Sequence, residues 1–305
     1  VSVLSFTDGV TLVPMLASMD HKRALDGDEG PNTGGMGAIC PNPHYTPELA
    51  AECMEKIFLP TMRAMNAEGR TFRGCLYFGL MLTKDGPKVI EYNCRFGDPE
   101  TQAVLPLLET DLLDIMEATA AGRLSELDIR WSPGASCCLI LASGGYPRAY
   151  KQGLPLAGLD ARGRLPGSGV EVYHAGTRFE GGKYYTNGGR VLGLTAVAPT
   201  LEEAVARAYA ASERVSFEGM HKRLDIGARA LQGPGGAGAC CRSFPLVCCR
   251  RSVGANRDAG REIIPDPASS HQPCRGRSPR RPAVMVFASL TAFRQPRREM
   301  LSRYI

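Results

Sequence analysis

Residues 89–102 hold the densest set of side chains that can do chemistry. A strand expected to end at Tyr92 places Glu91, Asn93 and Arg95 two residues apart, so the three side chains project to one face. A carboxylate and an amide oxygen on one face can hold Mg²⁺, a hard cation whose shell nucleotide phosphates usually complete. The forked donors of an arginine beside them suit phosphate oxygens. This combination is what phosphoryl transfer requires.

The alternation by itself is weak evidence, because a solvated strand face shows the same pattern. Residues 96–100 add a rigid turn and two further carboxylates, Asp98 and Glu100, which a plain strand end does not need. The functional interpretation is therefore favoured. Cys94 alternates to the opposite face, which predicts that it packs in the interior.

A charged and glycine-rich stretch at residues 20–37 is the second candidate site. Its glycines would let backbone N–H groups approach an anion closely. The Gly-Lys-Ser/Thr ending of a Walker A loop is missing. A glycine-rich surface loop flanked by charged residues explains the same residues on chemistry alone. The anion-binding loop and the plain surface loop both stay open as interpretations. The candidate substrate contacts here are Asp20, Lys22, Gly34, Gly35 and Gly37.

A third group consists of turns at residues 144–147, 174–177 and 187–190. Hairpin geometry explains most of their glycines. His174, near a strand end, is expected to be a hydrogen-bonded structural histidine, whereas Arg190 is a candidate contact for a substrate phosphate.

The elements expected around these segments mix short strands with three helices, which indicates an α+β fold. Thr46 is expected to cap one helix and Thr200 another, and Asp85-Gly86 is expected to turn a hairpin. Residues 20–44 are expected to form a long loop. The expected strands are residues 1–17 with a break at residues 8–9, 74–82, 88–92, 136–142, 170–174, 183–186 and 191–198, and the expected helices are residues 46–66, 101–121 and 200–215.

Charge and cysteine content exclude several classes of protein. The net charge of +5 combines −4 for residues 1–232 with +9 for residues 233–305. Residues 1–232 are therefore mildly acidic, which argues against a nucleic-acid-binding surface on them. No apolar run is long enough to predict a membrane span. Six cysteines precede residue 233 without metal or redox spacing, which is typical of cytosolic proteins, and we expect a cytoplasmic location.

Residues 233–305 differ in amino-acid composition and hydrophobic pattern from the rest of the chain. Their basic residues are all arginine, among repeated Pro, Ser and Cys, and apolar periodicity is absent until residues 283–293. We interpret this segment as a disordered or spurious tail that adds nothing to folding. An Arg-rich binding arm is the alternative interpretation.

Taken together, these segments resemble the phosphoribosylamine–glycine ligase family of the ATP-grasp superfamily. The resemblance runs in the family's order over about residues 1–231, and its most specific parts are residues 30–37 and 91–101. The remaining matching stretches are residues 19–23, 144–147, 174–177, 187–191 and 225–227.

The resemblance implies an α+β protein with three parts. Residues 1–121 would form the second half of an ATP-grasp domain, residues 122–232 a small C-terminal α+β ligase domain, and residues 233–305 the tail. The implied activity is ATP-dependent ligation of glycine to 5-phosphoribosylamine through a glycyl phosphate, in purine synthesis. The implied cofactors are ATP and Mg²⁺ or Mn²⁺.

The resemblance also implies a role for each candidate residue. Glu91 and Asn93 would bind the metal. The residues implied in catalysis are Arg95, Asp98 and Glu100, and those implied in substrate binding are Asp20, Lys22, Gly34, Gly35, Gly37 and Arg190.

The family's first domain and first ATP-grasp lobe have no counterpart in this sequence. We therefore expect a fragment of a longer ligase, inactive by itself and in some organisms fused to other purine enzymes. The alternatives are a non-catalytic remnant and an ATP-grasp ligase for another carboxylate.

Overall fold

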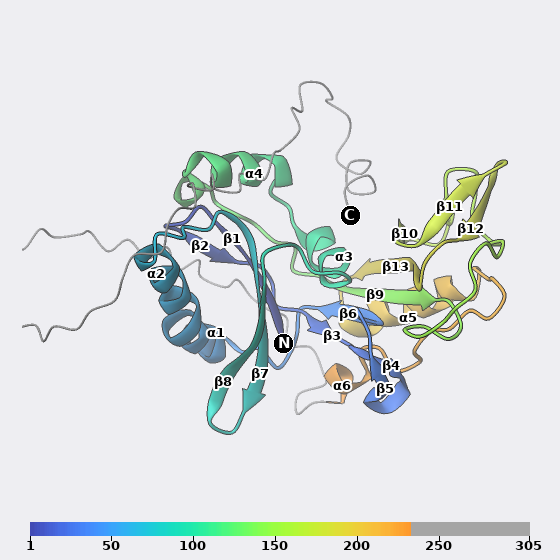
Figure 1. The fold of residues 1–305 in the computed structure, drawn as a ribbon, viewed down its shortest axis with the longest axis horizontal. Helices are drawn as coiled ribbons and strands as arrows, with labels where there is room; N and C mark the ends of the chain where they lie inside the picture. Colours follow the sequence, from blue (N-terminus) through green and yellow to red (C-terminus); the bar gives the residue numbers. More distant parts are fainter. Residues whose placement is uncertain (233–305) are drawn as a thin grey trace, which may run out of the picture.

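The computed structural model describes residues 1–232, and the interpretation of residues 233–305 as a tail lies outside this range. Every strand pairing in the described range is antiparallel, and two main sheets lie next to each other (Figure 1). No helix among the described residues is long and apolar enough to span a membrane. The predicted α+β class is confirmed.

The first sheet has four strands in the order β2-β1-β7-β8. Apolar side chains on one of its faces pack against a helical layer, where Phe58 and Phe78 lie with ring centroids 4.2 Å apart. The Thr46 side chain accepts from the amide of Leu49, as its capping position predicts. The bounds are β1 Ser2–Thr7, β2 Leu12–Pro14, β7 Gly74–Thr83, β8 Gly86–Asn93, α1 Pro47–Cys53, a π-helical turn Met54–Phe58, and α2 Leu59–Ala67.

The second sheet has five strands in the order β10-β13-β9-β6-β3. Its central strand β9 is buried along its whole length. Cys137 and Leu139 belong to the core cluster under α5, whereas Cys138 and Ile140 belong to the cluster on the α3 side. The bounds are β3 Met19–Asp20, β6 Gly37–Cys40, β9 Ala135–Ala142, β10 Val170–His174, β13 Arg190–Ala198, α3 Glu100–Val104 and α5 Leu201–Ser212.

The second sheet takes strands from both expected halves of the body. β3 and β6 come from the first half, and β6 pairs with β9 of the second. The division near residue 122 stays a prediction, and this sheet spans it. The elements outside the two sheets are the β4–β5 hairpin (Arg23–Leu25, Glu29–Asn32), the β11–β12 hairpin (Thr177–Glu180, Lys183–Thr186), α4 Leu112–Ala121 and α6 Ala228–Leu231.

Three sequence predictions were wrong. Residues 20–44 hold three short strands, β4, β5 and β6, and the last residue of β3, rather than one open loop. The helix expected over residues 101–121 is interrupted after Val104, because Pro106 cannot continue a helical hydrogen-bond ladder and Asp111 caps a new helix. Cys94 is exposed, while the other five described cysteines are buried. It lies beyond the end of β8, an edge strand, where no interior is available to it.

Candidate active site where the two sheets meet

The end of β8 carries Glu91 and Asn93, which pair with Gly79 and Tyr77 of β7 in unbroken register. This register places both side chains on one face of the sheet, as expected. Gly79 leaves room for the carboxylate, since a Cβ there would lie 2.7 Å from Glu91 Cγ. Arg95 lies past the strand, exposed, and donates to the carbonyl oxygen of Phe96.

Lys22 connects the second sheet to β8. Its Nζ lies 3.0 Å from Glu91 Oε1 and 3.7 Å from Asp20 Oδ2. The Lys22 and Glu91 side chains are 48% and 41% exposed, so their ion pair contributes little to stability. Its importance is geometric, because it brings together two residues that the sequence places 69 positions apart.

Asp20 is a buried acid without a hydrogen-bond partner, and its nearest cation is the Lys22 ammonium at 3.7 Å. Neither of its carboxylate oxygens has a hydrogen-bond partner among the described residues, although the side chain is 3% exposed. Burial, and after it the charge of nearby Glu100, raises the pKa of Asp20 to about 8. Glu100 is itself buried and accepts from the Ser2 hydroxyl at 3.3 Å. A buried carboxyl with free acceptors suits a cationic or hydrogen-donating ligand.

Arg190, the first residue of β13, joins the glycine-rich stretch to the turn after β8. Its Nη1 donates to the carbonyl oxygens of Gly34 (3.0 Å) and Asp98 (2.7 Å), and its Nη2 lies 3.2 Å from Asp98 Oδ2. Asp98 also accepts from the Gln102 amide. The structure thus brings three candidate residues together, with the Arg190 guanidinium engaged by Asp98 and not yet free for a phosphate.

The glycines of residues 34–37 permit close packing. A Cβ on Gly35, whose φ is +121°, would lie 2.4 Å from Pro99 Cδ and 2.7 Å from Asp20 Oδ1. Gly37 opens β6, where a Cβ would lie 2.8 Å from the carbonyl oxygen of Cys138. Gly35 therefore lies between Asp20, which adjoins Lys22, and Pro99, which follows Asp98.

Two backbone donors that were expected to face an anion are occupied by protein atoms. The Gly34 amide donates to the Tyr146 hydroxyl at 3.0 Å, and the Gly35 amide donates to the Thr33 hydroxyl at 2.9 Å. Anion binding by these glycines stays a prediction. Tyr146 is a contact that residue-level reasoning missed, and the only signal for it was the Gly-Gly-Tyr-Pro turn at residues 144–147.

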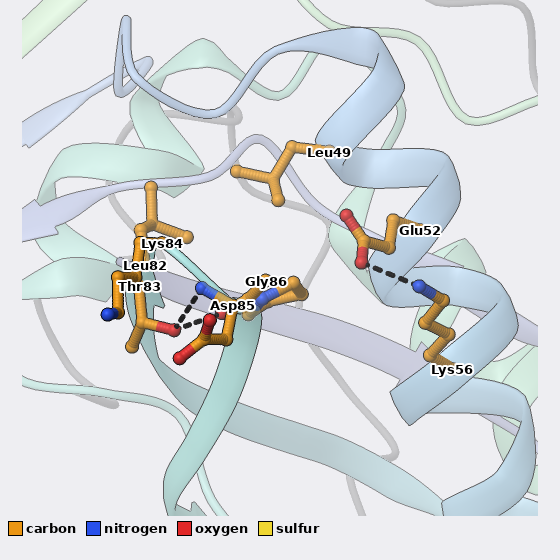
Figure 2. A pocket seen from close by; sticks show the side chains of 9 residues that line it. Leu49, Glu52, Lys56, Leu82, Thr83, Lys84, Asp85 and Gly86 are labelled. Carbon is orange, nitrogen blue, oxygen red and sulfur yellow. Dashed lines mark hydrogen bonds and ion pairs between the residues drawn. The ribbon is translucent and has the colours of Figure 1, made fainter.

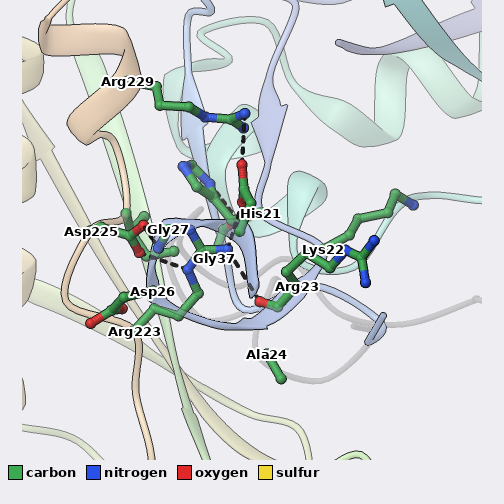
Figure 3. A network of polar contacts seen from close by, with 12 residues as sticks. His21, Lys22, Arg23, Ala24, Asp26, Gly27, Gly37, Arg223, Asp225 and Arg229 are labelled. Atoms are coloured by element: carbon green, nitrogen blue, oxygen red, sulfur yellow. Dashed lines mark hydrogen bonds and ion pairs between the residues drawn. The ribbon is translucent and has the colours of Figure 1, made fainter. Parts of the chain in front are cut away.

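Two polar residues near the site are structural. His174 contacts the Thr177 hydroxyl and the Gly163 carbonyl oxygen, both at 2.8 Å, as a structural histidine should. His21, between Asp20 and Lys22, is buried in the network of Figure 3. Its Nε2 accepts from the Gly227 amide at 3.2 Å, so Nδ1 carries the proton and donates to the Gly37 carbonyl oxygen at 3.2 Å.

The hollows on the surface lie away from these residues. One of about 550 Å³ opens between α1 and the tip of the β7–β8 hairpin, where Lys56 pairs with Glu52 (Figure 2). Another of about 530 Å³ lies beside Tyr150 and Lys151. Neither is lined by a candidate site residue. Within residues 1–232 no group of three His, Cys, Asp or Glu side chains is arranged to hold a metal ion.

Comparison with known proteins gives two matches to one family. Residues 1–101 match the family model described as phosphoribosylglycinamide synthetase, ATP-grasp (A) domain. Residues 136–229 match the one described as phosphoribosylglycinamide synthetase, C domain.

Curated relatives include phosphoribosylamine–glycine ligases and a trifunctional purine biosynthetic protein. A phosphoribosylamine–glycine ligase of Caldanaerobacter subterraneus subsp. tengcongensis is 49% identical over 227 residues, covering 74% of this chain and 53% of that protein. The trifunctional purine biosynthetic protein adenosine-3 of Gallus gallus is 48% identical over 232 residues, covering 76% of this chain and 23% of that protein. The chain therefore spans about half the length of its bacterial relative.

Solved structures agree. The phosphoribosylamine–glycine ligase of Thermotoga maritima aligns with a TM-score of 0.66 and 36% identity, over 74% of this chain and 55% of that one. The biotin carboxylase domain of Hydrogenobacter thermophilus 2-oxoglutarate carboxylase, solved with MgADP and bicarbonate, aligns with a TM-score of 0.50 and 16% identity, over 72% and 46%. The second likeness concerns the fold alone, and the ATP-grasp fold class is confirmed.

Replacing Gly35 with Ala tests the close approach at this site. The added Cβ has no space against Pro99 and requires a backbone conformation that alanine avoids, so we expect unfolding to cost about 2–4 kcal/mol less. Urea unfolding of the chain measures this loss. Gly27→Ala is the matched control, because Gly27 also has a positive φ but no atom within 4 Å of its Cβ position. Equal losses in the two variants would contradict the packing argument.

His21 predicts a pH dependence of stability. Burial lowers the pKa of His21 to about 4 from 6.5, and the charge of Arg223 acts in the same direction. The unfolded chain therefore binds a proton that the folded chain does not, and stability is complete above pH 6.5 and falls as the pH drops toward 4. The histidine contributes about 3 kcal/mol to this fall.

The free energy of unfolding, measured in urea between pH 7.5 and 4, checks this dependence. His21→Gln should flatten the slope, and His44→Gln, at an exposed side chain, should leave it as in the parent chain. A parent-like slope in His21→Gln would assign the pH dependence to other groups.

Proposed function

Since this chain belongs to the phosphoribosylglycinamide synthetase family, we propose that it supplies the metal-binding and substrate-binding half of an ATP-dependent ligase that joins glycine to 5-phosphoribosylamine. The product is glycinamide ribonucleotide, formed with ADP and phosphate in purine synthesis. The observation that carries this proposal is that two ion pairs adjoin Gly35. On one side Gly35 lies against Asp20, next to the Lys22–Glu91 pair, and on the other it lies against Pro99, which follows Asp98 of the Arg190–Asp98 pair.

Glu91 and Asn93 have the right chemistry for a nucleotide-bound cation. They offer one carboxylate and one amide oxygen on one strand face, and Mg²⁺ takes few protein ligands when phosphates complete its shell. When bound, Mg²⁺ neutralises charge on the nucleotide phosphates. The MgADP held by the Hydrogenobacter structure supports magnesium as the cation, and manganese, which prefers the same oxygen donors, stays an alternative.

Lys22 and Arg190 supply positive charge on the two sides of the proposed site. Lys22 neutralises Glu91 in this structure, so binding of a cation at Glu91 would release the ammonium toward a phosphate or carboxylate. Arg190 would make the same exchange, from Asp98 to a substrate phosphate. Arg95, exposed beside the metal pair, is proposed to contact the nucleotide phosphates.

The proposed reaction has two steps. The glycine carboxylate attacks the γ-phosphorus of ATP and ADP leaves, which gives glycyl phosphate. The amine of phosphoribosylamine then attacks the carbonyl carbon, phosphate leaves, and the nitrogen loses one proton. Asp20 suits the ammonium group of glycine, because its two buried oxygens have no hydrogen-bond partner among the described residues. Asp98 and Glu100, at the start of α3, are proposed to lie against the reacting groups.

The cellular setting is proposed by likeness. The chicken relative is a trifunctional purine biosynthetic protein, so fusion to other purine enzymes is one arrangement for the full-length ligase. We propose a cytoplasmic location and small-molecule substrates only.

A segment exchange tests the proposed function. A chimera in which residues 1–232 replace the matching segment of the Caldanaerobacter ligase should release ADP only when glycine and phosphoribosylamine are both present. The chain alone should not, because it spans about half that ligase and the family's first ATP-grasp lobe supplies the adenine contacts. Turnover by the chain alone would contradict the second expectation. A folded chimera without turnover would favour a non-catalytic remnant.

Glu91→Gln in this chimera tests the metal pair. The substitution keeps the shape and removes the charge that holds Mg²⁺, so turnover should fall on the order of 10²-fold or more. The melting temperature should change little, because the side chain is 41% exposed. A Mg²⁺ titration of the initial rate measures the effect. Cys94→Ala, at an exposed neighbour, should change neither quantity. If Glu91→Gln showed the Mg²⁺ dependence of the parent chimera, the proposal that Glu91 and Asn93 bind the metal would be contradicted.

A further inference from the structure

The segment of residues 221–227, here called the strap, holds the glycine-rich loop of residues 20–37 from outside the proposed site (Figure 3). Each contact joins parts of the chain that are almost 200 residues apart. The contacts between the strap and the loop are His221 Nε2 with the Ala24 carbonyl (2.7 Å), Arg223 Nη1 with the Arg23 carbonyl (3.2 Å) and Asp28 Oδ1 (2.9 Å), the Leu224 amide with Asp26 Oδ1 (2.7 Å), the Gly27 amide with Asp225 Oδ2 (2.9 Å), and the Gly227 amide with His21 Nε2 (3.2 Å).

Arg223 is the centre of the strap. Its side chain is 1% exposed, and a buried charge is costly unless it is paired and hydrogen-bonded. Nε and Nη2 donate to the two carboxylate oxygens of Asp225, both at 2.7 Å, while Nη1 crosses to Asp28 and the Arg23 carbonyl. The guanidinium therefore faces its own segment on one side and the loop on the other. A lysine in its place has no planar fork to divide in this way.

The strap fixes both neighbours of Lys22. His21 accepts from the Gly227 amide, and the Arg23 carbonyl accepts from Arg223. The Lys22 side chain is itself 48% exposed, and the Lys22 carbonyl oxygen accepts from the Thr33 amide (2.7 Å) and hydroxyl (2.8 Å) within the same loop. Its reach to Glu91 therefore depends on a backbone that its neighbours hold in place.

We infer that Arg223 is a positioning residue for the proposed ligase: through Arg23 and Asp28 it sets the backbone that presents Lys22 and Asp20 to Glu91. It touches no reacting group itself. The inference rests on the proposed function for its catalytic consequence, but not for its structural one. If Arg223 served only global stability, its loss would weaken all protected parts of the fold together.

Hydrogen exchange of the full chain, followed peptide by peptide, separates these two roles. Arg223→Lys should speed exchange of peptides within residues 20–37 by about tenfold or more and leave β9 and β13 unchanged. Asp26→Ala should do the same more weakly. It removes one contact, to the Leu224 amide, from an exposed side chain, and so keeps the test valid if the Arg223 variant unfolds. Arg178→Lys, in an exposed ion pair with Glu180, is the matched control.

Faster exchange confined to the loop in Asp26→Ala or Arg223→Lys supports the inference. Parent-like exchange in both variants, or equal acceleration of loop and strands, overturns it. In the chimera described above, Arg223→Lys should lower kcat roughly tenfold and change KM for ATP less than threefold, because a misplaced catalytic group costs rate rather than nucleotide affinity. An altered KM with parent kcat would overturn the catalytic consequence.

These two readouts also separate this inference from the proposed function. An inactive parent chimera would count against ligase activity, whereas loop exchange in the chain itself would still decide whether Arg223 positions Lys22.

Discussion

The approach of Gly35 to Pro99 and Asp20 is the constraint on which the rest of the site depends. At this point the glycine-rich loop, the turn after β8 and the end of β3 meet with no room for a side chain. Arg190 holds the same junction from β13 through the carbonyl oxygens of Gly34 and Asp98. The two sheets share no strand and are bridged by backbone hydrogen bonds between Ser2 and Ser18, and the contacts at Gly35 and Arg190 hold the turn after β8 against the second sheet near Lys22 and Glu91.

Two buried ionisable groups on either side of Lys22 in the fold, Arg223 and Asp20, have opposite surroundings. Arg223 donates to two carboxylates and a carbonyl oxygen and is complete within the described chain. Asp20 has no hydrogen-bond partner there. A fold keeps a buried carboxyl without a partner only at a cost, since desolvation opposes its charged form. The first group therefore belongs to the architecture, whereas the second has acceptors left for a ligand.

Much of the fold followed from local sequence. Helix caps at Thr46 and Thr200, the hairpin turn at Asp85-Gly86 and the strands β9, β10 and β13 of the second sheet were predicted within a few residues. These features depend on residues close in sequence. The strands within residues 20–44 were missed because they are short and polar, and distant partners such as β9 select them. Cys94 was misplaced because alternation was extended past the end of an edge strand.

The candidate site was predictable as a set of residues but not as an arrangement. The chemistry of Glu91, Asn93 and Asp98 follows from their types and spacing. The pairing of Lys22 with Glu91, and the burial of Asp20 beside Glu100, depend on side chains about 70 to 80 positions away in sequence. No local pattern encodes such contacts. Tyr146 shows the same limit, because it reaches Gly34 across 112 positions.

The strap gives the chain a particular order of assembly. Arg223 and Asp28 are 195 residues apart, and contacts that close so long a loop form late, after more local pairings. During synthesis, which proceeds from the N-terminus, the loop is made long before the arginine that neutralises Asp28. Until residue 223 emerges, Asp28 and Asp26 have no strap to meet, and the backbone on both sides of Lys22 has only the contacts within its own loop, such as that of Thr33 with the Lys22 carbonyl oxygen. A nascent chain can thus complete both hairpins of the first sheet before the strap is made. The loop that carries Lys22 gains its contacts to the strap only after that.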